Sequence, residues 1–78
     1  MDEAQMRAAR ALLGWSQTEL AEASGLSLPT IKRMEKIGPR RSGFETVEAV
    51  EHALEKGGVQ FIAENGGGPG VRLAKSEK

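Results

Sequence analysis

The stretch that decides the fold is Ser16–Glu35, SQTELAEASGLSLPTIKRME, in which two helix starts are separated by a single glycine. Ser16 and Glu19 form the pattern Ser-x-x-Glu, a capping box in which each side chain bonds the other residue's backbone amide. Gly25 is typical of the residue that ends a helix in the left-handed conformation. Ser27 precedes a proline-containing first turn, which predicts a second helix start. The stretch therefore predicts two short helices joined by a tight turn.

Helical patterns also lie on both sides of this stretch. Apolar residues recur at the i, i+3, i+7 spacing of one helix face in residues 4–13 and again in residues 44–58. These positions are Met6, Ala9 and Leu13 in the first segment, and Val47, Val50 and Leu54 in the second. A Gly-Pro pair ends the third helix and a loop follows. Either Ser42 or Thr46 is the expected cap of the fourth helix.

The end of the chain changes from helical to alternating periodicity. Val59 and Phe61 alternate with Gln60, a glycine-rich turn follows, and Val71 and Leu73 flank a charged residue, so a β-hairpin is predicted. The fold class expected is mainly α, a four-helix domain with a short C-terminal β-hairpin. Residues 1–57 are the expected helix-turn-helix domain, and residues 58–78 are the hairpin and tail, a possible dimerisation element.

Composition excludes several classes of function. The chain has 78 residues and no cysteine, so it holds neither a disulfide nor a thiolate site. A domain of this size leaves little room for a substrate cleft, and we expect no enzymatic activity and no cofactor. No segment approaches the roughly 20 apolar residues that span a membrane. The acidic amino terminus does not resemble a signal peptide, so a cytoplasmic protein is expected.

The net charge of zero hides a local basic stripe. Residues 30–43 contain five cations against one glutamate, whereas residues 44–58 are mainly acidic. The five cations are Lys32, Arg33, Lys36, Arg40 and Arg41. Such a stripe indicates a phosphate-rich partner, although a merely solvated charged face is the alternative for this run taken by itself.

A glycine and a short turn make the second and third helices cross steeply, which is the helix-turn-helix geometry. The pattern resembles the phage-repressor type of this motif, found in the Cro-like or XRE family of transcriptional regulators. The residues that carry the resemblance are Ser16, Gln17, Leu20, Ala21, Gly25, Leu26, Ser27, Thr30, Ile31 and Glu35. The resemblance covers about residues 6–54 and implies that the helix at about 28–36 enters the major groove of double-stranded DNA.

The resemblance also implies individual roles. The DNA-binding residues expected from it are Gln17, Ser27, Leu28, Thr30, Lys32, Arg33, Lys36, Arg40 and Arg41. Arg10 and Glu35 are expected to form a structural ion pair. Leu28 and Pro29 depart from the family pattern, because their side chains cannot hydrogen-bond base edges. A contact with a thymine methyl group or a packing role remains for Leu28.

Two classes of function are open. The first is a DNA-binding regulator that acts as a homodimer on a pseudo-palindrome, with the hairpin as candidate contact by strand pairing or by packing across a two-fold axis. The hairpin residues concerned are Val59, Phe61, Ile62, Val71 and Leu73. Packing of the same strands on the fourth helix is the alternative for them. The second class is a protein-interaction module, antitoxin-like or an accessory factor, which the neutral net charge keeps open.

Other candidate sites are weaker. His52 has no cysteine or second histidine to share a metal, so no metal site is expected and a helix-face histidine is preferred. The glycines at 66–70 lack the Lys-Ser/Thr of a phosphate loop and are interpreted as the hairpin turn. Trp15 is expected in the core rather than stacked on a base.

Overall fold

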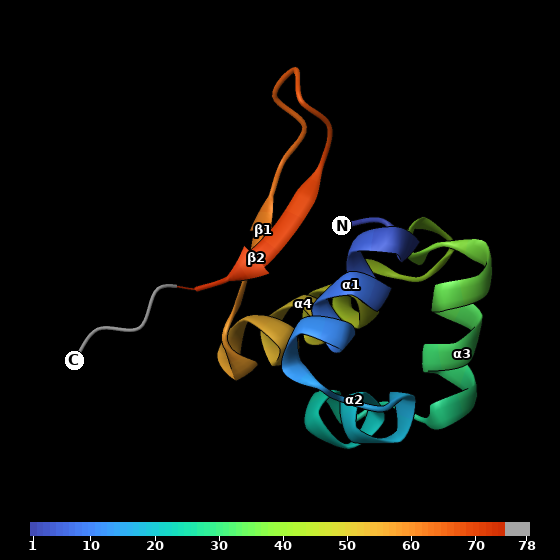
Figure 1. The fold of residues 1–78 in the computed structure, drawn as a ribbon. Coiled ribbons are helices and arrows are strands. Elements are labelled where there is room, and N and C mark those ends of the chain that lie inside the picture. Colours follow the sequence, from blue (N-terminus) through green and yellow to red (C-terminus); the bar gives the residue numbers. More distant parts are fainter. Residues whose placement is uncertain (75–78) are drawn as a thin grey trace.

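The structure, a computed structural model, describes residues 1–74 as four α-helices, one 3₁₀ turn and a two-stranded antiparallel sheet (Figure 1). The elements are α1 (Glu3–Leu13), α2 (Gln17–Ser24), α3 (Leu28–Ile37), η1 (Pro39–Arg41), α4 (Phe44–Gly57), β1 (Val59–Ile62) and β2 (Gly70–Leu73). The mainly α fold with a C-terminal hairpin is the one predicted from the sequence. Across residues 1–74, no helix is both long and apolar enough to cross a membrane.

The starts of α2 and α3 follow the local signals in the sequence. Ser16 Oγ accepts from the Glu19 amide at 3.0 Å, and Glu19 Oε1 accepts from the Ser16 amide at 2.7 Å, which completes the predicted capping box. Ser27 Oγ caps α3 by accepting from the Thr30 amide at 3.3 Å. Gly25 ends α2 with φ of 75°, a left-handed backbone conformation that residues other than glycine rarely adopt. The predicted starts of α2 and α3 and the predicted end of α2 are therefore confirmed.

The predicted cap of α4 was wrong. The N-cap is Gly43, in extended conformation and without a side-chain hydrogen bond, rather than Ser42 or Thr46. Residues Pro39–Arg41, predicted as loop, form a 3₁₀ turn that the Ser42 amide closes by donating to the Pro39 carbonyl at 2.8 Å. The Ser42 amide closes the 3₁₀ turn, so Ser42 does not cap α4. The helix begins two residues later, at Phe44, and Thr46 lies inside its first turn.

The core lies between the helices and receives side chains from each of them. Its buried members are Met6, Ala9, Leu20, Ala21, Ile31, Met34, Val50, Ala53, Leu54 and Val59. The predicted inward positions Ile31, Met34, Val50 and Leu54 are among them, whereas Val47 is only partly buried and packs against the core. In α2, Ser24 is half-buried and Ala23 is exposed, whereas Trp15 packs against the core as expected. Burial of this apolar surface is the main stabilising term of a fold without disulfides.

The hairpin packs against helices of the same chain. Val59 pairs with Leu73 and Phe61 with Val71, so these four side chains share one face of the hairpin. Val59 is buried and both Phe61 and Val71 pack against the core, with β1 on α4 and α1, and β2 on α1. Ile62 and Gly70 form the strand pair next to the hairpin turn, and Gln5 Nε2 donates to both of their carbonyls, at 3.2 Å and 2.8 Å. The apolar face of the hairpin is thus used within the monomer.

Candidate nucleic-acid interface

The turn between α2 and α3 is short and closed by the backbone. The Leu26 amide donates to the Ala21 carbonyl at 3.1 Å, and α2 and α3 pack against each other directly. In Figure 1, α3 lies along one side of the molecule, the hairpin lies on the other side, and α1 lies between them. The outer face of α3 is therefore free of the hairpin.

The two sides of α3 differ in chemistry. Ile31 and Met34 are buried, whereas the cations of the helix, Lys32, Arg33 and Lys36, are exposed. Since successive residues of an α-helix are about 100° apart, these three cations fall within one arc of roughly 100°. The apolar residues hold α3 to the core, and the cations are presented to solvent.

The 3₁₀ turn η1 extends this basic surface beyond the end of α3. Pro39 is buried and anchors the turn, whereas Arg40 and Arg41 are exposed. We call the five exposed cations Lys32, Arg33, Lys36, Arg40 and Arg41 the cationic face. Over residues 1–74, no member of the cationic face forms an ion pair with a carboxylate of the chain. Unpaired, exposed cations are available to phosphates without the cost of breaking an existing contact.

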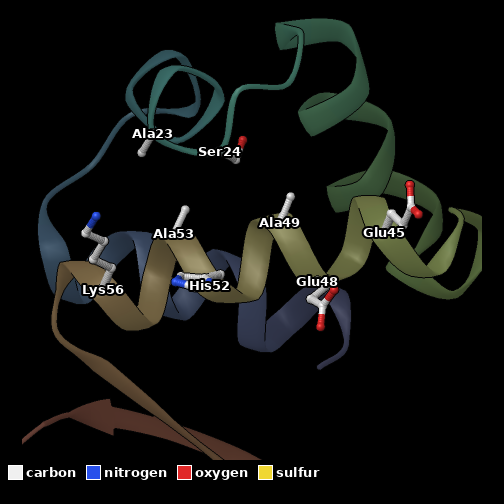
Figure 2. Close-up of a pocket in the computed structure, with 8 residues that line it drawn as sticks. All are labelled: Ala23, Ser24, Glu45, Glu48, Ala49, His52, Ala53 and Lys56. Atoms are coloured by element: carbon white, nitrogen blue, oxygen red, sulfur yellow. The ribbon is translucent and has the colours of Figure 1, made fainter.

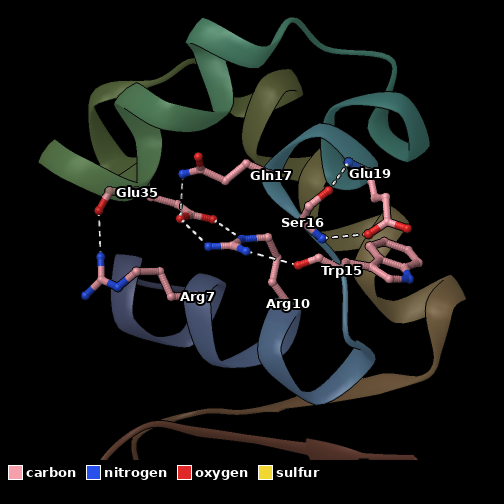
Figure 3. Close-up of polar contacts among 7 residues, drawn as sticks. All are labelled: Arg7, Arg10, Trp15, Ser16, Gln17, Glu19 and Glu35. Atoms are coloured by element: carbon pink, nitrogen blue, oxygen red, sulfur yellow. Dashed lines mark hydrogen bonds and ion pairs between the residues drawn. The ribbon is translucent and has the colours of Figure 1, made fainter.

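One acidic residue of α3, Glu35, points inward rather than to solvent. Glu35 is 5% exposed, and its carboxylate accepts from Arg10 Nε at 2.6 Å and from Arg10 Nη2 at 2.8 Å (Figure 3). The expected ion pair is confirmed as a bidentate one. The hydrogen bonds to Glu35 raise the pKa of Arg10 above its ordinary value; partial burial opposes this shift, and the negative charge of Glu35 adds to it. Arg10 is therefore a permanent cation.

Two further side chains converge on Glu35 from α1 and α2. Gln17 Nε2 donates to Glu35 Oε1 at 3.1 Å, and Arg7 Nη1 donates to the Glu35 carbonyl at 2.6 Å (Figure 3). Arg10 Nη1 also donates to the Trp15 carbonyl at 3.0 Å. These contacts tie α3 to α1 and to the start of α2, which fixes the angle at which α3 is presented.

Arg7 was not among the predicted site residues. Its position three residues before Arg10 places both guanidinium groups on one side of α1, and this spacing was the signal available in the sequence. Gln17, expected at a phosphate or a base edge, has its amide turned toward Glu35 in this structure. Its contact with DNA stays a prediction.

The first turn of α3 carries the remaining predicted contacts. The hydroxyl groups of Ser27 and Thr30 lie 2.9 Å apart and share a hydrogen bond. Leu28 is half-buried and Pro29 is exposed. The start of α3 therefore offers hydroxyl groups and apolar surface, whereas its charged groups lie further along the helix.

A groove of about 410 Å³ lies between α2 and α4, and no residue of the cationic face lines it (Figure 2). Its lining residues are Ala23, Ser24, Glu45, Glu48, Ala49, His52, Ala53 and Lys56. Ala49 and Ala53 point from α4 toward α2, Glu45 lies at the first turn of α4, and Glu48 extends from the side of α4 that faces away from α2 (Figure 2). Carboxylates repel phosphate, so this groove does not suit nucleic acid. His52 is exposed on its rim.

Comparison with protein families identifies the arrangement. The family model HTH_3, described as Helix-turn-helix, matches residues 6–60. This range includes α2, α3 and α4 completely and most of α1. The match therefore covers both the helix pair and the Glu35 contacts that orient it. Comparison with curated proteins gives no match.

Proposed function

The chain belongs to the Cro/C1-type helix-turn-helix family of DNA-binding regulators, the XRE family, and we propose that it is a sequence-specific transcriptional regulator that acts as a homodimer. The observation that carries the proposal is the cationic face, whose five cations are exposed and free of ion pairs in residues 1–74. Three of these cations lie on α3, and the opposite side of α3 is held to α1 and α2 by the hydrogen bonds of Glu35.

In the proposed complex, α3 lies in the major groove and α2 braces it against the backbone. Arg33 takes a guanine edge with two hydrogen bonds, a contact that discriminates by about 1–3 kcal/mol. Arg40 and Arg41 neutralise phosphates beyond the groove and position the domain without reading sequence. Two copies of α3 then meet successive major grooves about 34–36 Å apart.

The proposed regulator is tested first by the salt dependence of binding to duplex DNA. Each phosphate contact contributes about 0.9 to the slope of log affinity against log salt concentration. Arg40→Ala and Arg41→Ala are each expected to flatten the slope by about that amount. Lys56→Ala removes the same charge from α4 and serves as the matched control, with an unchanged slope. Unchanged slopes for both arginine variants would exclude the phosphate contacts.

Sequence specificity needs a separate measurement. Genomic fragments retained by the protein at moderate salt are sequenced, and a short inverted repeat is expected. Arg33→Ala is expected to relax the preference at one base position of each half-site while preserving the others. Retention of arbitrary sequence that disappears as salt is added would contradict a sequence-specific regulator.

A second candidate function is a protein-interaction module, and the observation that favours it is the groove between α2 and α4. Its acidic rim residues, Glu45 and Glu48, complement a basic segment of a partner protein. Glu45→Lys with Glu48→Lys is expected to abolish such binding and to leave DNA binding intact. Loss of DNA binding in this variant would argue that α4 faces the nucleic acid.

A further inference from the structure

The loop that closes the hairpin contains the only asparagine of the chain, Asn65, which Gly66 directly follows. Strand β1 ends at Ile62 and β2 begins at Gly70, so both residues lie in the connection between the strands. In Figure 1 this connection forms the outer tip of the hairpin, away from the four helices. Asn65 and Gly66 are exposed. Water therefore reaches the Asn65 side chain and the backbone that follows it.

An asparagine that precedes a glycine carries both partners of a self-modification, and asparagine is among the thermolabile residues. The glycine backbone nitrogen attacks the asparagine Cγ, and the new N–Cγ bond closes a succinimide ring. The Cγ–Nδ2 bond breaks, and the amide group leaves as ammonia with the proton of the attacking nitrogen. Water then opens the ring at either carbonyl carbon, which gives aspartate or isoaspartate. The net change exchanges ammonia for water and needs no oxidant.

Two features of this loop favour the ring closure. Gly66 has φ of +100° and no atom lies within 4 Å of the position that a Cβ would take, so nothing crowds the attacking nitrogen from that side. A glycine also reaches backbone angles that a side chain would forbid. Over residues 1–74, the hydrogen bonds of the loop involve the Glu64 side chain and not the Asn65 side chain. The Asn65 amide is therefore free to turn toward the Gly66 nitrogen.

Glu64 acts in the opposite direction. Its Oε2 accepts from the Gly66 amide and from the Gly68 amide, each at 3.2 Å. The attacking nitrogen has to give up its proton and gains negative charge as it does so, and a neighbouring carboxylate disfavours that charge. The two hydrogen bonds also hold the loop in one conformation. Glu64 therefore restrains the nitrogen on which the reaction depends.

We propose that Asn65 is a site of spontaneous deamidation, and that the Glu64 carboxylate slows the reaction by holding the Gly66 amide. The site is separate from the cationic face, so it does not depend on the proposed function. The product carries a second carboxylate next to Glu64, and the net charge, zero in the unmodified chain, becomes one unit negative. Isoaspartate also lengthens the main chain of the loop by one carbon.

Deamidation is tested by incubating the full chain at neutral pH and physiological temperature. Isoelectric focusing separates the acidic product, peptide mass spectrometry locates it, and methylation by an isoaspartyl methyltransferase measures isoaspartate. Wild type is expected to accumulate an acidic product modified at Asn65. Gly66→Ala is expected to slow its formation by at least about tenfold, because a side chain restricts the backbone angles needed for attack.

The urea-unfolded chain provides the reference for this site. It contains the same Asn65 and Gly66 but lacks the folded loop, so it reports the rate without the contacts of Glu64. Asn65→Gln is the blank and is expected to give no acidic product over the same period. Absence of the product from folded wild type, in an incubation that deamidates the unfolded chain, would overturn the site.

The role of Glu64 is measured separately. Glu64→Ala is expected to speed formation of the product by at least about threefold, because the Gly66 nitrogen loses both its hydrogen-bond acceptor and the adjacent negative charge. Glu55→Ala removes an exposed carboxylate from α4 and is the matched control, with the rate of wild type. Far-UV circular dichroism checks that each variant is folded. An unchanged rate in Glu64→Ala would overturn the restraint, and a slower rate would overturn it in favour of a carboxylate that accepts the proton.

Discussion

Replacement of Arg10 by Met tests how α3 is held against the rest of the domain. The Glu35 carboxylate is 5% exposed and accepts three hydrogen bonds, two from Arg10 and one from Gln17. The substitution removes two of the three and leaves a buried charge with a single donor. Loss of one partner from a buried ion pair costs about 3–5 kcal/mol. One small core supplies roughly 3–5 kcal/mol of net stability, so Arg10→Met is expected to be largely unfolded at room temperature.

The assay is urea unfolding followed by far-UV circular dichroism, with sulfate added so that the weaker variants keep a folded baseline. Glu35→Leu and the double variant Arg10→Met/Glu35→Leu complete a double-mutant cycle. Because the double variant contains no unpaired buried charge, it is expected to be more stable than Arg10→Met. We expect a coupling energy of at least about 1.5 kcal/mol between the two sites.

Arg33→Met is the matched control, since Arg33 is exposed and makes no ion pair within residues 1–74. Its free energy of unfolding is expected to stay within about 0.5 kcal/mol of wild type. A cost below about 1 kcal/mol for Arg10→Met, or additive effects in the cycle, would refute the argument that Glu35 depends on Arg10.

Three further substitutions probe local features of the fold. Gly57→Ala is expected to destabilise by about 1–3 kcal/mol, because its Cβ would lie 2.8 Å from the Trp15 ring; an unchanged melting temperature would contradict this close approach. Ser16→Ala removes the capping box with Glu19 and is expected to cost about 1 kcal/mol, measured as a lower urea midpoint at constant slope. Gln5→Leu deprives two hairpin carbonyls of their side-chain donor, so amides of β1 and β2 are expected to exchange faster while those of α2 and α3 do not; uniform acceleration would argue against a local role.

Helix boundaries were predictable where a residue acts on its own backbone. Ser16 with Glu19, and Ser27 with Thr30, satisfy amides only three residues away, so the signal is complete within the sequence. The start of α4 was mispredicted because it depends on how the preceding chain turns. Ser42 has the chemistry of a cap, but its amide closes the 3₁₀ turn.

The candidate interface was predictable to a similar degree. The exposure of Lys32, Arg33 and Lys36 followed from helical periodicity, since the buried positions of α3 leave them on the opposite side. The pairing of Arg10 with Glu35 came from the family resemblance, and the structure confirms it.

The sequence by itself determined the helices, the hairpin and the cationic face, because caps, left-handed glycines and apolar spacing act over three to seven residues. Only the tertiary structure decided which groups meet across long separations. Glu35 receives Arg7, Arg10 and Gln17 from two other helices, and Gln5 holds strand ends more than fifty residues away. The packing of the helices brings these groups together, and no local pattern encodes it. The same packing covers one face of the hairpin and leaves Asn65 exposed in the loop that closes it.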